Sequence, residues 1–353
     1  MTAEALDGLL QEVKAMKLAY VTDKKPGYTR EKKGDSFIYL DKAGNKITDE
    51  EEIKRIRSLV IPPAWTSVWI CPKPNGHLQV TGIDVAGRKQ YKYHKLWSEA
   101  RNERKHNRMA DFAKALPLIR EQVEKDLRIK ELTKEKVLAI AVSVIDKTYI
   151  RVGNSEYAKL YGSFGLTSLR DRHLKVSGNT MKVAFVGKKG VFQEITLTHA
   201  RLSKLMKKLQ DIPGQELFQY YDKDGNRHSL ESGDVNAYLK SISGKDFTAK
   251  DFRTWWGTVT AAARLAELLP YASETEAKRN IVETLDFVAS KLGNTRTVCK
   301  KYYVHPTLLS RYEDGKFDQY VGRLKKLRGS SNTTELLEAE ERLIGEFIKA
   351  ECS

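Results

Sequence analysis

The stretch RHLKVSGNTMKVAFVGKKGVFQEITL, residues 172–197, decides the fold class of this 353-residue chain. Three runs rich in β-branched and aromatic residues are separated by SGNT and GKKG, which predicts a three-stranded antiparallel meander. The segments on both sides carry helical patterns instead. KVLAIAVSVI, residues 136–145, is apolar all round, which is typical of a buried helix. The sequence therefore predicts an α+β fold, in which a mostly helical domain carries a short sheet.

Capping residues predict where the later helices begin. Thr248 with Asp251 marks one helix start, and Ser273 with Glu276 marks the next. A last helix is predicted from about Thr334. Apolar residues at helical spacing give the helix after Ser273 a buried face: Ile281, Leu285, Val288 and Leu292.

The N-terminal part differs from the rest, so we expect a small β-rich domain over residues 1–93 and a larger, mostly helical domain over residues 94–353. Thr48 with Glu51 predicts one helix through about Leu59. Lysine-rich loops and Asn-Gly or Ala-Gly turns separate the predicted strands. Those strands are DSFIYLD (35–41), SVWICP (67–72), HLQVTGID (77–84) and KQYKYH (89–94).

The charge of the chain predicts its class of partner. Lys and Arg number 62 against 46 Asp and Glu, a formal net charge of +16. Such a surplus favours a polyanion, most often nucleic acid, over a merely basic protein. The first residues, MTAEALDGLLQEVKAMK, do not resemble a signal peptide, and no apolar run approaches the roughly 20 residues that span a membrane. We therefore expect a cytoplasmic protein without a membrane partner.

Several kinds of chemistry are not indicated. Cys71, Cys299 and Cys352 are far apart, and the seven histidines show no ligand spacing. The chain lacks a GxxxxGK[ST] loop and a G-x-S-x-G elbow. We expect no cofactor and no zinc site. A carboxylate metal site stays open, because Asp and Glu clusters have no tight spacing rule.

The passage LGNTRTVCKKYYVHP, residues 292–306, places two tyrosines behind two lysines. Gly293 is expected to end one helix, and Thr297 to cap the next. That break allows Asn294 and Tyr303 to face one pocket, which a continuous helix would prevent because they are nine residues apart.

The two adjacent tyrosines are predicted to differ in role. Tyr302 shares a helix face with Val298 and is the expected core residue. Tyr303 shares its face with Cys299 and lies near Lys300. Its hydroxyl is therefore the predicted working group.

Four cations supply candidate anion contacts. Arg151 follows the buried helix in TYIRVGN, and Lys188 lies at the predicted hairpin tip. Lys250 and Arg253 lie in the first turn of a helix, where each opposes the macrodipole by roughly 0.3–1 kcal/mol. That placement is favourable when an external anion binds there. The alternatives are an ion pair with a carboxylate for Arg151 and a solvated turn for Lys188.

These residue types suit one reaction. A tyrosine with a reference pKa near 10 is a poor nucleophile unless cations favour its phenolate. Arginine and asparagine donors stabilise charge that develops on a phosphodiester, and a lysine can protonate the departing alkoxide. The set predicts covalent phosphoryl transfer from DNA to tyrosine.

The motifs GRKQYKYH, RVGNSEY, FVGK, KDFRTW and LGNT…KKYYVHP occur in the order found in one family, and they extend over nearly the whole chain. The chain resembles the type IB DNA topoisomerases, specifically the bacterial and poxvirus-like branch. The resemblance implies a monomeric two-domain clamp around duplex DNA at the nucleoid. It also implies transient cleavage of one strand through a 3′-phosphotyrosyl link, strand rotation and resealing, without ATP or an obligatory metal.

The resemblance also assigns roles. Tyr303 would be the nucleophile, Arg151 and Arg253 would contact the scissile phosphate, and Lys188 would be the general acid for the 5′-hydroxyl. Asn294 departs from the histidine usual in the family, and would donate to a non-bridging oxygen without carrying charge. The implied DNA-binding residues are Gln90, Tyr91, Tyr93, Tyr157 and Lys250.

Two alternatives stay open. A tyrosine recombinase shares the same Arg, Lys, Arg and Tyr chemistry, but usually has H-x-x-R at the second arginine, where this chain has Lys250 before Arg253. Its N-terminal domain would also be helical rather than β-rich. The other alternative is a DNA-binding clamp without enzymatic activity.

Overall fold

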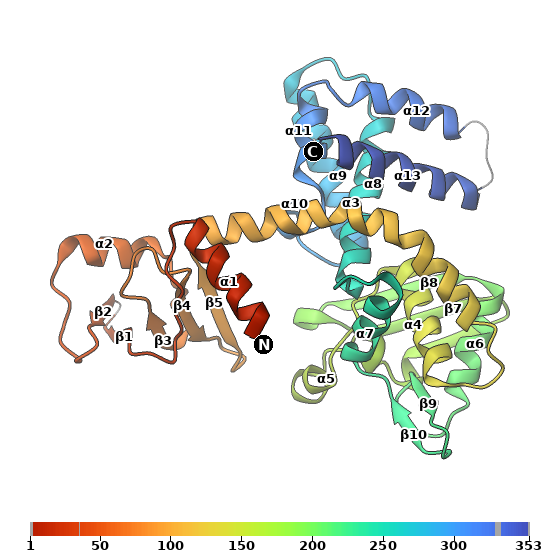
Figure 1. The fold of residues 1–353 in the computed structure, drawn as a ribbon, viewed down its shortest axis with the longest axis horizontal. Coiled ribbons are helices and arrows are strands. Elements are labelled where there is room, and N and C mark those ends of the chain that lie inside the picture. Colours follow the sequence, from red (N-terminus) through yellow and green to blue (C-terminus); the bar gives the residue numbers. More distant parts are fainter. Residues whose placement is uncertain (1–2, 35, 329–332, 352–353) are drawn as a thin grey trace. The chain divides into compact units, whose positions relative to one another are not determined.

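The computed structural model describes residues 3–34, 36–328 and 333–351. It confirms the α+β class, with a β-rich N-terminal part and a larger helical part (Figure 1). The chain is divided into two compact units, Met1–Lys105 and His106–Ser353. The domain boundary predicted after residue 93 lies just before helix α3 (Lys95–Asp126), which continues through the division between the units.

The first unit is built on a five-stranded antiparallel sheet of order β2-β1-β3-β4-β5. The core beside it contains Ile56, Val68, Ile70 and Val80. Four of the strands were predicted. β1 was not, because YTREKK reads as a lysine-rich loop, yet it pairs with both β2 and β3. The elements are α1 (Ala3–Ala15), β1 (Tyr28–Lys33), β2 (Ser36–Leu40), α2 (Glu50–Ser58), β3 (Thr66–Ile70), β4 (Leu78–Ile83) and β5 (Lys89–Tyr93).

Helix α2 ends where expected but is capped by a different residue. Its N-cap is Asp49, whose Oδ1 accepts from the backbone N of Glu51 at 3.0 Å. The prediction that Thr48 caps this helix was therefore wrong by one position. Asp and Thr both serve as N-caps, so adjacent candidates are not separable by type alone.

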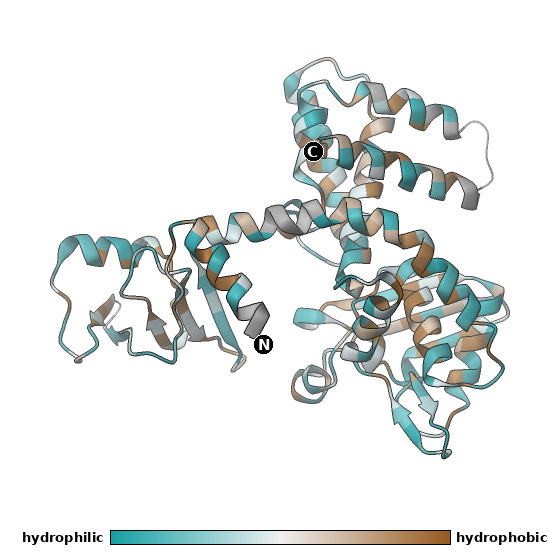
Figure 2. Cartoon of the chain, viewed as in Figure 1, coloured by the Kyte–Doolittle hydropathy of each residue, from teal (hydrophilic) through white to brown (hydrophobic). Residues whose placement is uncertain are grey.

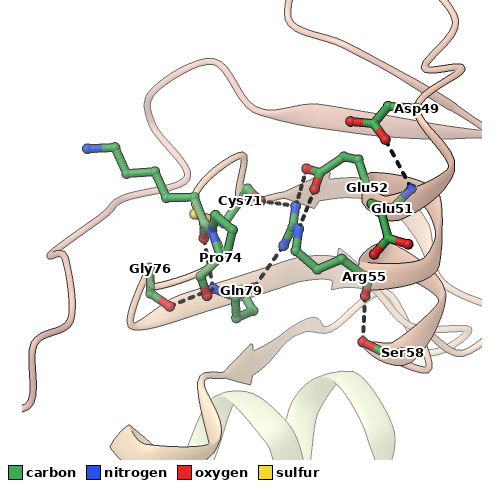
Figure 3. Close-up of polar contacts among 10 residues, drawn as sticks. Asp49, Glu51, Glu52, Arg55, Ser58, Cys71, Pro74, Gly76 and Gln79 are labelled. Atoms are coloured by element: carbon green, nitrogen blue, oxygen red, sulfur yellow. Dashed lines mark hydrogen bonds and ion pairs between the residues drawn. The ribbon is translucent and has the colours of Figure 1, made fainter.

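A partly buried polar network orders the turn between β3 and β4 (Figure 3). Arg55 makes a two-bond ion pair with Glu52, and donates to the carbonyl of Cys71 at 2.9 Å and to Oε1 of Gln79 at 3.2 Å. Gln79, itself 3% exposed, then donates to the carbonyl of Gly76 at 2.7 Å. Because buried polar groups need partners, these side chains fix the turn in one conformation.

The second unit is mostly helical and contains the predicted meander. The sheet order is β6-β7-β8, and a separate hairpin joins β9 to β10. Its helices are α4 (Lys134–Thr148), α5 (Ser155–Tyr161), α6 (Ala200–Gln210), α7 (Ser232–Ser243), α8 (Ala249–Glu267), α9 (Glu274–Leu292), α10 (Arg296–Tyr302), α11 (Pro306–Glu313), α12 (Asp318–Arg328) and α13 (Thr333–Glu351). Its strands are β6 (Leu174–Ser177), β7 (Thr180–Val186), β8 (Phe192–Thr198), β9 (Gln219–Tyr221) and β10 (Arg227–Ser229).

The predicted helix patterns are confirmed. Every residue of 136–145 in α4 is buried, and Figure 2 shows hydrophobic residues along α4 and the C-terminal half of α3. Helix α8 begins with a capping box of Thr248 and Asp251, and Ser273 caps α9. The apolar stripe of α9 is buried throughout: Ile281, Leu285, Val288 and Leu292.

Two further predictions concern the chain as a whole. Among the described residues, no helix is both long enough and apolar enough to cross a membrane. Cys71 and Cys299 are buried free thiols, whereas Cys352 lies outside the described residues.

Candidate active site

A turn that contains Asn294 separates α9 from α10, as predicted, and Tyr303 lies at the far end of α10. Gly293 ends α9 with a φ of 58°, a left-handed conformation that glycine adopts without a Cβ clash. Helix α10 begins two residues earlier than expected. Its N-cap is Thr295, which accepts from the backbone N of Val298, so the prediction of Thr297 was wrong.

At the C-terminal end of α10, helix α8 contacts the backbone of Tyr303. Thr258 donates through its hydroxyl to the Tyr303 carbonyl at 3.3 Å, and accepts from the backbone N of His305 at 3.0 Å. A Cβ on Gly257 would lie only 2.6 Å from the same carbonyl oxygen. Sequence reasoning did not find Gly257 and Thr258, whose one signal is a pair of small residues after two tryptophans.

The burial of the two tyrosines is the reverse of what was expected. Tyr303 is only 9% exposed and belongs to the core, whereas Tyr302 is partly buried at its edge. The ring of Tyr302 has the ammonium groups of Lys250 and Lys301 at 6.0 and 5.4 Å from its centroid. Tyr303 is the C-cap of α10, and its backbone N donates to the carbonyl of Cys299.

Arg253 lies beside Tyr303. Its Cζ is 5.3 Å from the centre of the Tyr303 ring, and Nη2 donates to the carbonyl of Leu292 at 2.7 Å. Nη1 donates to the carbonyl of Tyr149. Burial, followed by the charge of Arg151, lowers the pKa of Arg253 to about 10, against an opposing contribution from Tyr303. Among the described residues, its buried Nε has no hydrogen-bond partner.

Arg151 also bonds to the α9–α10 turn. Its Nη2 donates to the carbonyl of Gly293 at 3.0 Å and to Oδ1 of Asn294 at 2.7 Å. Burial lowers the pKa of Arg151, whereas Tyr303 and Cys299 raise it. Within the described part of the chain Arg151 makes no ion pair with a carboxylate, and its guanidinium is bonded to oxygens of Gly293 and Asn294 instead.

The amide of Asn294 is oriented by two groups. Oδ1 faces Arg151, and Nδ2 donates to the carbonyl of Leu292 at 3.4 Å. The structure thus places the oxygen of Asn294 against a catalytic candidate. Sequence reasoning had considered only its NH₂ group.

Lys188 lies at the tip of the β7–β8 hairpin, as predicted. A 3₁₀ turn over Lys188–Gly190 forms this tip, with Lys189 and Gly190 both at positive φ. Burial first, then the charge of Arg151, lowers the pKa of Lys188, and Tyr303 opposes that shift. A small cleft is lined by Arg151, Lys188, Gln193, Arg253 and Lys291, among others. The structure therefore brings Lys188 to the same site as the arginines.

Lys250 and Tyr157 lie around this centre in different ways. Lys250 is in the first turn of α8, and after burial, Arg151 and Lys189 its charge adds the smallest contribution that lowers the pKa of Lys188. Tyr157 is 46% exposed on α5, with its ring 5.5 Å from that of Tyr161.

The first unit presents its own candidate residues on β5. Tyr91 and Tyr93 are exposed on one face, with ring centres 6.2 Å apart and planes at 12°. Gln90 faces the other way, and its Nε2 donates to Oδ2 of Asp84 at 2.9 Å. The two tyrosines and Gln90 therefore do not share one surface.

The aromatic surface of the first unit extends beyond β5. Tyr20, 40% exposed, stacks on His77 with centres 4.8 Å apart and planes at 10°. His77 in turn lies 6.2 Å from Tyr93. Sequence reasoning did not identify Tyr20 or His77, because they are distant from β5 along the chain.

A groove much larger than the small cleft lies elsewhere in the second unit. A groove of about 640 Å³ is lined by residues of α3 and α13, including Arg120 and Glu341. Its lining contains none of the candidate catalytic residues described above. In the part of the chain that the structure describes, no group of three His, Cys, Asp or Glu residues is arranged to hold a metal ion.

Comparison with known proteins identifies the class. Residues 92–329 match the family model for the catalytic core of eukaryotic DNA topoisomerase I, and residues 36–84 match the N-terminal domain of bacterial DNA topoisomerase IB. The class is therefore that of the DNA topoisomerases, isomerases that act on duplex DNA.

Individual relatives indicate which type of DNA topoisomerase the chain is. DNA topoisomerase 1B of Acanthamoeba polyphaga mimivirus is 33% identical over 301 residues, which cover 82% of this chain and 88% of the relative. DNA topoisomerase 1B of Vaccinia virus (strain Copenhagen) is 25% identical, over 69% of this chain and 74% of the relative. The chain belongs to the type IB DNA topoisomerases. The recombinase and the non-enzymatic clamp are thereby rejected.

Proposed function

We propose that this chain relaxes supercoiled duplex DNA through a 3′-phosphotyrosyl intermediate on Tyr303, without ATP or an obligatory metal. The observation that carries the proposal is the convergence of five residues from distant parts of the second unit. Arg151 reaches Asn294 at 2.7 Å, Arg253 lies over the ring of Tyr303, and the charges of Arg151 and Tyr303 act on Lys188. This is the donor set that phosphoryl transfer to a tyrosine requires.

In the cleavage step, the Tyr303 oxygen attacks the scissile phosphorus and a new P–O bond forms. The bond from phosphorus to the 5′-oxygen breaks, and its electron pair leaves on that oxygen. The tyrosine proton passes to solvent, and Lys188 supplies a proton to the 5′-oxygen. Because one phosphodiester replaces another, resealing is the reverse reaction and needs no nucleotide. Strand rotation takes place between the two steps.

Arg151 and Arg253 would stabilise the charge that develops on the non-bridging oxygens. Both are held in place by backbone carbonyls before DNA binds, so little reorganisation is needed in the transition state.

Asn294 would serve this centre with both ends of its amide. Its oxygen orients Arg151. Its NH₂ has two donors, and the 3.4 Å bond to Leu292 is long for N–H···O, so a donor remains for a non-bridging oxygen. An asparagine would in this way take the place of the histidine usual in the family.

Lys188 is suited to the general-acid role. A lysine with an ordinary pKa near 10.4 holds its proton strongly at neutral pH. Burial and the neighbouring cations lower the pKa of Lys188, which favours transfer of the proton to a leaving alkoxide.

The remaining candidates would bind DNA outside the reaction centre. Tyr91, Tyr93 and Tyr157 offer exposed aromatic surface, and Lys250 offers a charge next to Lys188. Gln90 would bind only if it leaves Asp84. From the family resemblance we further propose that one copy of the chain closes around the duplex as a clamp, and that it acts on the nucleoid in the cytoplasm.

Plasmid relaxation in excess chelator and without ATP tests the proposal. The wild-type protein is expected to relax the plasmid. Tyr303→Phe, which removes one hydroxyl, is expected to bind DNA but to lose relaxation by several orders of magnitude. Tyr302→Phe is the matched control and should retain activity. Relaxation by Tyr303→Phe together with an inactive Tyr302→Phe would reverse the assignment of the pair.

A further inference from the structure

Gln193 lies between two parts of the reaction centre that are far apart in the sequence. It is the second residue of β8, on the return strand of the hairpin that carries Lys188. Its side chain also reaches the α9–α10 turn that Arg151 holds. Neither the motifs nor the proposed mechanism assigns Gln193 a role.

Two glycines accommodate this side chain. A Cβ on Gly187, the residue before Lys188, would lie 3.1 Å from Cγ of Gln193. A Cβ on Gly293, the residue before Asn294, would lie 2.7 Å from Oε1 and 2.8 Å from Nε2 of Gln193. The methylene groups of Gln193 thus pack on the hairpin, and its amide packs on the turn.

The amide of Gln193 is itself held in place. Nε2 donates to the carbonyl of Phe192 at 3.2 Å, which keeps the amide over Gly293. The carbonyl of the same Gly293 accepts from Arg151. Gln193 also lines the small cleft together with Lys188, Arg151 and Arg253. One side chain therefore connects the position of the lysine to the position of the arginine.

We infer that Gln193 is a positioning residue that fixes the Lys188 hairpin relative to the Arg151–Asn294 pair. The inference rests on the proposed general-acid role of Lys188. A hairpin tip with two positive-φ residues is joined to the sheet by a single pair of strands. The backbone N of Phe164 donates to the carbonyl of Val186 at 2.8 Å and holds the base of the tip. A contact with the turn that carries Asn294 would in addition fix the tip relative to Arg151. Gln193 supplies that contact.

The test uses a substrate on which general acid catalysis is unnecessary. Single-turnover cleavage is measured on ordinary duplex DNA and on DNA with sulfur in place of the bridging 5′-oxygen, since the thiolate leaves without protonation. A misplacement of about 1 Å can cost on the order of 10²-fold in rate. Gln193→Ala is therefore expected to slow cleavage of ordinary DNA by roughly 10- to 100-fold. It is expected to cleave the sulfur DNA at nearly the wild-type rate.

Two controls separate this inference from the proposed function. Thr196→Ala changes an exposed residue of the same strand and should cleave both substrates normally. Lys188→Ala, run in parallel, reports on the general acid itself. If Lys188→Ala is equally slow on both substrates, the proposed role of Lys188 fails.

The inference about Gln193 is overturned by either of two results. One is a normal rate of Gln193→Ala on ordinary DNA, which would show that the contact does not position the lysine. The other is an equal slowing on both substrates, which would show a general disturbance of the site. Normal cleavage of the sulfur DNA also shows that the variant is folded.

Discussion

His305, two residues after Tyr303, is 2% exposed, and burial lowers the pKa of its imidazole to about 4. Its Nδ1 accepts from the backbone N of Thr307 and so caps α11. A buried neutral histidine at this place couples the stability of the site to pH. Between about pH 6.5 and 4 the unfolded chain binds this proton and the folded chain does not, so stability falls as pH falls.

His305→Asn tests that coupling. Asparagine keeps an acceptor at the N-cap but does not titrate. Between pH 7 and pH 4 the wild-type protein should lose up to about 3 kcal/mol of unfolding free energy through this one group. The variant should lose less by about that amount, as measured by urea unfolding at both pH values. An identical loss in the two proteins would show that His305 is not the sensitive group.

For single residues, the sequence predicted which side chains belong to the candidate site but not how those side chains are oriented. Arg151, Lys188, Arg253 and Tyr303 were predicted as site residues because their motifs occur in a family order, and they stay predictions. The direction of the Asn294 amide was not, because it depends on Arg151 from another part of the chain. Likewise, the packing of Gln193 against Gly293 could not be predicted, because the two residues are far apart in the sequence.

Among the elements, helix α8 positions Tyr303 through a close approach of two backbones. Gly257 permits that approach, since its Cβ would lie 2.6 Å from the Tyr303 carbonyl oxygen. The element therefore does more than carry Arg253 at its N-terminal end. It also fixes where α10 ends.

Gly257→Ala should destabilise the protein and reduce relaxation. In an open helix, Gly→Ala stabilises by about 0.5–1 kcal/mol, but overpacking against backbone costs about 1–3 kcal/mol. The matched control is Gly322→Ala in α12, where a Cβ would meet nothing within 4 Å and should stabilise. Denaturation midpoints and relaxation rates of both variants provide the comparison. Equal gains in stability would contradict the account of α8.

The elements themselves were predictable to different degrees. The β6–β8 meander and α4 were predicted because their apolar periodicity is strong and the buried face is wide. β1 was not predicted, because its charged residues show no alternation of apolar and polar side chains. The caps of α2 and α10 were misplaced by one or two residues, because TD and TRT each contain two capping candidates of similar propensity.

For the whole molecule, the net charge of +16 belongs with a duplex DNA substrate. Net charge predicts which partners a protein associates with, but it does not predict the fold. Composition alone therefore predicted the class of partner correctly. It could not distinguish an enzyme from a binding protein, which required the motifs and the family comparison.

Binding should consequently depend steeply on salt. The logarithm of the association constant is expected to fall with the logarithm of salt concentration, with a slope of about −0.9 for each phosphate neutralised. Lys250→Ala should reduce the slope by about one unit, whereas the exposed Thr196→Ala should not change it. Filter binding or fluorescence anisotropy between low and moderate salt measures both. A nearly flat dependence would contradict largely electrostatic binding.

The most direct test of the proposed 3′-phosphotyrosyl link maps the covalent adduct. A duplex is prepared with a label on the 5′ side or on the 3′ side of the scissile phosphate, and trapped protein is isolated under denaturing conditions. Peptide mass spectrometry then identifies the modified residue. We expect the 5′-labelled fragment to remain attached, through its 3′-phosphate, to Tyr303. Attachment of the 3′-labelled fragment, or a nucleotide on Tyr302, would contradict it.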